Sequence, residues 1–263
     1  DDVMRKIAAE LRYSETAFVR RVGDAAFETR YFTPVAEVDI CGHATIAAFH
    51  TLASEDLISG GTGYVNRTRA GELNIDIKDG TVWMDMAEPK ALRTMSDAGE
   101  LRELYSVMGP IPRPSVAGLY PEIISTGLPD IIMPVASRGL LNALAPDFPA
   151  LAKLSERNGV TGVHAFCVDA DVPDTFHCRN FAPLYGIDEE AATGTANGAL
   201  TYYLYRHRMV MADMANTFVQ GEAMGRTSCV LTRLTRHAAA AGGGVSIRVG
   251  GSAVILASGE LRV

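Results

Sequence analysis

The sequence has few cysteines, no basic cluster and no long apolar run, and each of these absences removes a class of protein. The four cysteines are scattered, without a Cys-x-x-Cys pair, so we expect no disulfide framework. The net charge is −7, and no cluster of lysine and arginine is interleaved with aromatic residues, which argues against a nucleic-acid partner. No apolar run approaches the roughly 20 residues of a membrane span, so we expect no membrane partner.

Signatures of leaders, metals and nucleotides are missing as well. No apolar stretch follows the first charged residues, so the expected location is cytoplasmic. The six histidines show no HExxH or paired spacing, and we expect no metal. The run at residues 60–63 lacks the Gly-Lys-Ser/Thr of a P-loop and does not fit a dinucleotide fingerprint, so we expect no cofactor.

The sequence does contain the same signature twice, about 149 residues apart. Four pairs share the 149-residue offset, and one glycine pair has an offset of 152: Arg30/Arg179, Phe32/Phe181, Pro34/Pro183, Asp39/Asp188 and Gly42/Gly194. The offsets predict that the second copy has three extra residues just before its glycine. Two copies are too few for a solenoid and indicate a pair of similar halves.

Hydrophobic periodicity predicts many strands and few helices. Strands are expected at 17–19, 26–33, 63–67, 71–78, 82–86, 123–125, 130–134, 163–168, 175–182, 217–220, 227–235 and 245–256. Helices are expected at 2–12, from His43, at 97–108, at 147–158 and at 195–208, and a small-residue turn at 238–244. A run with Pro110, Pro112 and Pro114 predicts a boundary, giving halves 1–109 and 110–263. The predicted fold class is α+β, with a curved, mostly antiparallel sheet wrapped around a central helix in each of two pseudo-symmetric halves.

Each copy of the signature leads from a strand through a glycine turn into a helix. Gly42-His43 begins one helix and Gly194-Thr195 the other. The first turn of a helix has unpaired N–H groups and a partial positive charge, so it binds carboxylate or phosphate readily. We therefore expect a small anion between the two helix starts. The alternative is that each glycine only lets strand and helix pack closely.

Several motifs together resemble the phenazine-biosynthesis isomerase (PhzF-like) family, in chain order and over the whole sequence. They are Ser14-Glu15-Thr16-Ala17-Phe18, Phe32-Thr33-Pro34 with Asp39-Ile40-Cys41-Gly42-His43-Ala44-Thr45, Phe181-Ala182-Pro183 with residues 186–196, and Gln220-Gly221-Glu222 with Met224-Gly225-Arg226. The resemblance implies a diaminopimelate-epimerase-like fold with a site between its two halves. The duplication read from the residues agrees with that fold.

The resemblance also implies roles for individual residues. Glu15 matches the family's acid/base glutamate, Gly42 and His43 match its substrate-binding pair, and Gly194 and Thr195 match the facing anion-binding turn. The implied reaction is a cofactor-independent proton shift on a small carboxylic acid, with Glu190 as a further catalytic candidate. For this role, we expect burial to raise the pKa of Glu15 toward neutrality.

The sequence departs from the family pattern in three places. Glu190 stands where the family usually has aspartate, and Ala191 stands where it usually has proline. The family's first strand and Gly-Asn-Pro turn would precede Asp1, so we expect the first sheet to lack that strand.

Other functions compete with the isomerase. Racemases and epimerases of this fold use two cysteines, one at each helix start; Cys41 fits that position, whereas the opposite residue is Thr193. A Cys/Thr pair resembles hydroxyproline dehydratases, and Cys41 as a small apolar residue in a tight turn is the simpler interpretation. A binding protein that kept the site without the chemistry is a further alternative. The expected partner is a small carboxylate, with a second copy of the chain as another candidate.

Overall fold

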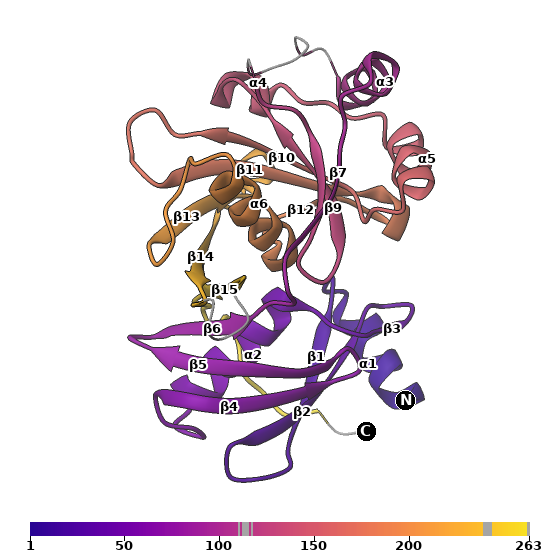
Figure 1. The fold of residues 1–263 in the computed structure, drawn as a ribbon. Coiled ribbons are helices and arrows are strands. Elements are labelled where there is room, and N and C mark those ends of the chain that lie inside the picture. The colour runs from indigo at the N-terminus through magenta and orange to yellow at the C-terminus, as the bar shows by residue number, and fades with distance from the viewer. Residues whose placement is uncertain (110, 112–115, 117, 239–243, 262–263) are drawn as a thin grey trace. The chain divides into compact units, whose positions relative to one another are not determined.

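The computed structural model describes residues 1–109, 111, 116, 118–238 and 244–261 (Figure 1). The chain forms two compact units: unit 1 comprises Asp1–Asp85 with Gly250–Val263, and unit 2 comprises Met86–Val249. They differ from the predicted halves, 1–109 and 110–263, at residues 86–109 and at 250–263. The proline run at 110–114 and the small-residue turn at 238–244 fall largely outside the described residues. No helix in the described part of the chain is long and apolar enough to cross a membrane.

Unit 1 combines a mixed sheet with two helices. Its elements are α1 (Asp2–Leu11), β1 (Thr16–Arg21), β2 (Ala26–Phe32), β3 (Glu37–Val38), α2 (Gly42–Ser54), β4 (Gly61–Thr68), β5 (Gly71–Lys78) and β6 (Thr81–Asp85). The strand order is β1-β2-β4-β5-β6, with β3 on β2, and only the β2–β4 pair is parallel. The sheet is therefore mostly antiparallel, as predicted.

Alternation along β2 explains why α2 packs on the sheet. Phe27, Thr29 and Tyr31 are buried at every second position, and the rings of Phe27 and Phe49 meet edge to face at 5.4 Å. At the other end of the sheet, Asp79 and Gly80 both have positive φ and join β5 to β6. This is the two-residue hairpin predicted from Asp-Gly.

The last segment of the chain returns to unit 1 and packs on Trp83 of β6. A Cβ atom on Gly250 would lie 2.7 Å from two atoms of the indole ring, so only a glycine backbone fits there. Residues 250–263 are therefore attached to unit 1 by a direct backbone-to-ring contact.

Unit 2 is larger and has helices on both faces of its sheet (Figure 1). Its elements are β7 (Lys90–Thr94), α3 (Ala98–Met108), β8 (Glu122–Ser125), β9 (Pro129–Pro134), α4 (Arg138–Asn142), α5 (Phe148–Asn158), β10 (Val163–Val168), β11 (Thr175–Ala182), η1 (Pro183–Tyr185), β12 (Ile187–Glu190), α6 (Gly194–Arg206), β13 (Ala215–Gln220), η2 (Glu222–Met224), β14 (Ser228–Arg236) and β15 (Val245–Gly251). The strand order is β15-β14-β13-β11-β10-β9-β8-β7, with β12 on β11.

Alternate residues of the central strands face different helices. On β9, Ile131 and Met133 belong to the core that contains residues of α3, α4 and α5. Ile132 belongs instead to the core formed with α6. Because successive strand residues point to opposite faces, α6 lies on one face of the sheet and α3, α4 and α5 lie on the other.

Strand register confirms the internal duplication that the sequence predicted. In unit 1, Phe27 of β2 is opposite Asn66 of the parallel strand β4. In unit 2, Phe176 of β11 is opposite Phe218 of the parallel strand β13. Each pair has the offset expected from the two copies, 149 residues for the first member and 152 for the second.

The position of the three extra residues differs from the prediction. Arg30 makes two hydrogen bonds to Glu37 of β3, and Arg179 makes the same two to Glu189 of β12. Glu37 and Glu189 are already 152 residues apart, so the insertion precedes Glu189, near the 3-10 turn η1, and does not lie just before Gly194. The Arg–Glu pairs fix this alignment, and the offset between Asp39 and Asp188 does not mark equivalent residues.

Candidate functional site at the start of α2

Three of the predicted site residues meet at the N-terminus of α2. Cys41 is the extended residue before the helix, His43 is the second residue of α2, and Glu15 immediately precedes β1. Nε2 of His43 lies 3.1 Å from Oε2 of Glu15, and Sγ of Cys41 lies 3.6 Å from Nδ1 of His43. Pairing of β1 with β2, and packing of Cys41 against Tyr31 of β2, bring Glu15 to the helix start.

Burial differs among these three side chains. The Glu15 side chain is 9% exposed and Cys41 is buried, whereas the His43 side chain is 32% exposed. The imidazole is therefore the edge of the cluster that solvent or a ligand reaches. Ser14 also lies at this edge, with Oγ 3.5 Å from Nε2 of His43.

The charge state of Glu15 differs from the expectation. Burial alone would raise the pKa of its carboxyl, but hydrogen bonding and charge from His43, with smaller contributions from Ser14 and Cys41, lower it overall. The carboxyl is therefore ionised and can accept a proton. Burial raises the pKa of the Cys41 thiol, which stays protonated at neutral pH.

A chain of buried hydrogen bonds holds the start of α2 on the sheet. Thr45 donates to the carbonyl of Cys41 at 2.7 Å, and the hydroxyl of Tyr31 lies 2.5 Å from Oγ1 of Thr45. Asn66 donates to that Tyr31 hydroxyl and accepts from Thr29. Since these side chains come from β2, β4 and α2, the position of Cys41 depends on all three elements.

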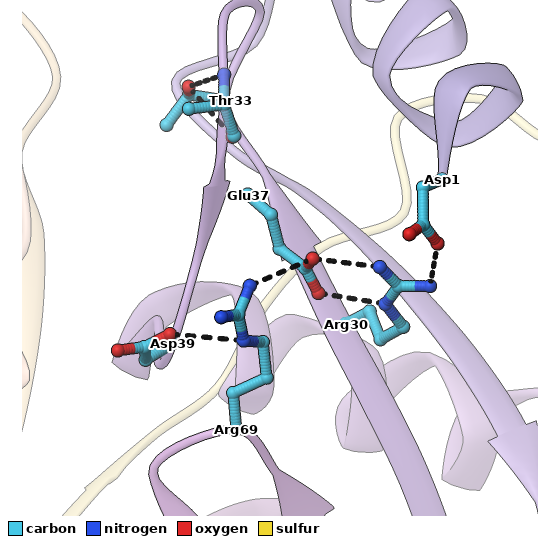
Figure 2. Close-up of polar contacts among 7 residues, drawn as sticks. Asp1, Arg30, Thr33, Glu37, Asp39 and Arg69 are labelled. Atoms are coloured by element: carbon cyan, nitrogen blue, oxygen red, sulfur yellow. Dashed lines mark hydrogen bonds and ion pairs between the residues drawn. The ribbon is translucent and has the colours of Figure 1, made fainter.

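An ion-pair cluster fixes the connection that leads to Cys41 (Figure 2). Arg30 contacts Asp1 and Glu37, and Arg69 bridges Glu37 and Asp39. The hydrogen bonds to Arg30 lower the pKa of Glu37, which favours the ionised pair. Thr33 closes the preceding turn by accepting from the N–H groups of Val35 and Ala36.

The start of α6 in unit 2 has a different polar arrangement. Thr193 occupies the position equivalent to Cys41, in an extended conformation, and its hydroxyl donates to Glu190 at 2.8 Å. Gln220 donates to the same hydroxyl and to the carbonyl of Glu190. Thr126 donates to the carbonyl of Thr195, the second residue of α6, which begins at Gly194. The structure thus brings together Glu190, Thr193, Gly194 and Thr195.

The acids before α6 serve separate purposes. Glu189 is committed to Arg179, Asp188 is exposed, and only Glu190 faces Thr193. The sequence gave no reason to separate these three roles.

Several buried polar residues under α6 were not identified from the sequence. Asn197 of α6 contacts Gln220 and His164, and His164 in turn contacts Asn180. Asp130 is 1% exposed, and burial followed by the charge of Glu190 raises its pKa to about 8. A polar residue inside an otherwise apolar strand, as in Asp130-Ile-Ile-Met or Val-His164-Ala-Phe, is the signal that would have marked them.

Among the described residues, Glu15, Cys41 and His43 are also the group with metal-binding spacing. Their possible ligand atoms, one oxygen, one sulfur and one nitrogen, all lie within 4.8 Å of one another. The sequence analysis missed this group because its members do not form a local metal motif.

Comparison with known proteins identifies relatives over the whole chain. The family model of phenazine biosynthesis-like proteins (PhzC-PhzF) matches residues 1–259. An uncharacterized isomerase of Clostridium acetobutylicum is 33% identical, covering 99% of this chain and 88% of that protein. The uncharacterized isomerase YddE of Escherichia coli K12 is 31% identical, covering 88% of this chain and 80% of that protein.

Solved structures support the same fold. A PhzF-family phenazine biosynthesis protein of Bacillus anthracis superimposes with a TM-score of 0.84 at 24% identity, covering 96% of this chain and 86% of that one. A probable proline racemase of Agrobacterium radiobacter K84 superimposes with a TM-score of 0.62 at 14% identity, covering 97% and 81%. The predicted epimerase-like α+β fold is thereby confirmed.

Proposed function

This chain belongs to the PhzF family of phenazine biosynthesis-like proteins and is an isomerase, and we propose that it shifts a proton within a small carboxylic acid without a cofactor. Glu15 is the proposed general acid/base. The observation that carries this proposal is the contact between the ionised Glu15 carboxylate and the His43 imidazole, in a cluster with only its His43 edge exposed.

The proposed reaction begins at the start of α2. The helix N-terminus, with Gly42 as its first residue, binds the substrate carboxylate through N–H groups that have no partner within the helix. Glu15 then takes a proton from a carbon activated by the conjugated acid, and it returns that proton to another carbon of the same system. The electron pair moves through the conjugated system, and His43 stabilises the negative charge that develops.

Substrate binding would also adjust the basicity of Glu15. A substrate that covers the exposed edge of His43 removes water from the cluster and raises the proton affinity of the carboxylate. Glu190, held by Thr193 in unit 2, is proposed to position substrate and not to transfer the proton. That the substrate lies between the two halves stays a prediction.

Deuterium incorporation from D₂O tests the role of Glu15. We expect the chain to exchange a carbon-bound proton in at least one member of a panel of small amino, hydroxy and cyclic diene carboxylic acids. Glu15→Gln keeps size and polarity but cannot accept the proton, so exchange should fall by about 10²–10⁴-fold. Glu10→Gln, on the exposed face of α1, is the matched control and should exchange normally.

The same assay separates the alternative functions. Cys41 lies close enough to His43 for a thiol-based racemase or dehydratase to be the second candidate. In that case Cys41→Ala would abolish exchange while Glu15→Gln would retain it. Binding of acids without exchange in any of them would indicate a catalytically inactive binding protein. Glu190→Gln should reduce exchange less than Glu15→Gln does.

A further inference from the structure

The Glu15–Cys41–His43 cluster offers a set of donor atoms beyond what proton transfer needs. One carboxylate oxygen, one thiol sulfur and one imidazole nitrogen are within 4.8 Å of one another. Mixed sulfur, nitrogen and oxygen donors are typical of Zn²⁺, whereas Mg²⁺ and Ca²⁺ take oxygen donors. The chemistry of the set therefore selects a borderline-soft divalent ion.

The distances between donor atoms match those around such an ion. Nε2 of His43 is 3.1 Å from Oε2 of Glu15 and 3.7 Å from Sγ of Cys41. With Zn–N and Zn–O bonds of about 2.1 Å and a Zn–S bond of about 2.3 Å, a tetrahedral site has N···O and N···S edges of about 3.4 Å and 3.6 Å. Small side-chain movements would thus bring all three donors onto one ion.

The fold also provides rigidity and access. Cys41 is held through its carbonyl by Thr45 and packs on Tyr31, so the thiol position depends on the core of unit 1. His43 is the exposed member, which gives an ion a route to the cluster from solvent. Three protein donors leave a fourth tetrahedral position for water.

We propose that Glu15, Cys41 and His43 form a Zn²⁺-binding site and that the bound ion inhibits the proton-transfer reaction. The ion takes up the carboxylate and imidazole that the reaction requires, while the Cys41 thiol gives its proton to solvent and binds as thiolate. Inhibition rests on the proposed function, but metal binding itself does not. Zn²⁺ is thus a regulator of this isomerase and not its cofactor.

Metal titration of the purified chain, without substrate, tests the site. We expect calorimetry to give one Zn²⁺ per chain, and Co²⁺ to produce a sulfur-to-cobalt charge-transfer band with the visible bands of a tetrahedral ion. Cys41→Ser should remove the charge-transfer band and weaken binding by at least about ten-fold, the lower end of the loss seen for residues that only support a ligand. Glu15→Gln, which keeps the side-chain size, should also weaken binding.

Cys229→Ser is the matched control because Cys229 is an exposed free thiol in unit 2. It should leave both the stoichiometry and the cobalt spectrum unchanged. Circular dichroism verifies that each variant is folded before its titration is interpreted. The proposal is overturned if the folded wild-type chain binds no Zn²⁺, or if binding survives both Cys41→Ser and Glu15→Gln or disappears with Cys229→Ser.

Deuterium exchange in the presence of Zn²⁺ completes the test. Added Zn²⁺ should suppress exchange, and a chelator should restore it. Stoichiometric binding without loss of exchange would overturn the inhibitory role alone. Because binding is measured without substrate, failure of the metal site and failure of the isomerase proposal give different results.

Discussion

Asp130 is a carboxyl group in the core of unit 2, and its protonation links folding to pH. The residue is 1% exposed, and Oδ1 has no hydrogen-bond partner among the described residues. Burial, together with the charge of Glu190, raises its pKa from 3.8 to about 8. Between these two values the unfolded chain releases the proton while the folded chain keeps it. The contribution of Asp130 to stability therefore falls as pH rises from about 4 to about 8.

Asp130→Asn should remove this pH dependence because the amide does not ionise. Relative to wild type, we expect its free energy of unfolding to increase between pH 4 and pH 8 by at least about 1 kcal/mol, the equivalent of one pKa unit. Urea titrations at several pH values measure the difference. Asp171→Asn, on an exposed turn of the same unit, should track wild type across the range. A constant offset between Asp130→Asn and wild type would contradict the linkage.

At the scale of elements, each unit contains one arginine that joins a central strand to a short edge strand. Arg179 also donates to the carbonyls of Leu141, Asn142 and Leu144, so it fixes α4 and the turn that follows. Its side chain is 10% exposed, against 25% for Arg30. Arg179 and Arg30 also lie over the rings of Phe181 and Phe32, at 4.8 Å and 5.2 Å.

Arg179→Lys should therefore cost more stability than Arg30→Lys. Lysine cannot reproduce a two-bond contact with a carboxylate, and at position 179 it also leaves buried carbonyls unpaired. We expect losses of about 2–3 kcal/mol for Arg179→Lys and about 1 kcal/mol for Arg30→Lys. Chemical unfolding of the two variants side by side gives the comparison. Equal losses would mean that the carbonyl contacts contribute little.

Gly162 marks the closest approach between elements in unit 2. A Cβ atom there would lie 1.9 Å from the carbonyl oxygen of Phe181, so β11 would have to move away from the start of β10. Gly162→Ala should destabilise the chain by at least about 2 kcal/mol. Gly61→Ala, where a Cβ atom has no neighbour within 4 Å, should change stability by less than about 0.5 kcal/mol. Thermal unfolding measures both, and a stable Gly162→Ala would mean that the strands separate at little cost.

Strong local patterns were enough to predict most elements, and elements that depend on distant partners were missed. β2 and β11 alternate clearly, and Asp97 and Asp147 cap α3 and α5 as polar residues at helix starts usually do. β7 was missed because all five of its residues are exposed and it exists only by pairing with β8. β12 was missed because its acidic residues suit a helix start equally well, and its strand form depends on Arg179.

The candidate site was predictable to a different extent in each unit. Cys41 and His43 are two residues apart, and family resemblance supplied Glu15, which strand pairing brings to them. In unit 2, Glu190 and Thr193 were named from the sequence, but their contacts with Gln220 and Asn197 arise only when β13 and α6 come together. The direction of the Glu15 pKa shift was wrong because it depends on the distance to His43, which no spacing rule provides.

At the scale of the whole molecule, the contact between Gly250 and Trp83 has a consequence for synthesis on the ribosome. Unit 1 is interrupted: its first 85 residues emerge early, and its last segment emerges only after all of unit 2. Unit 2 is continuous and can fold while the rest is still being translated, whereas the indole of Trp83 is covered only after residue 250 has left the exit tunnel. Trp83 is the single tryptophan, so its fluorescence should change when nascent chains are extended beyond this point, and the N-terminal part of unit 1 must wait for its final segment.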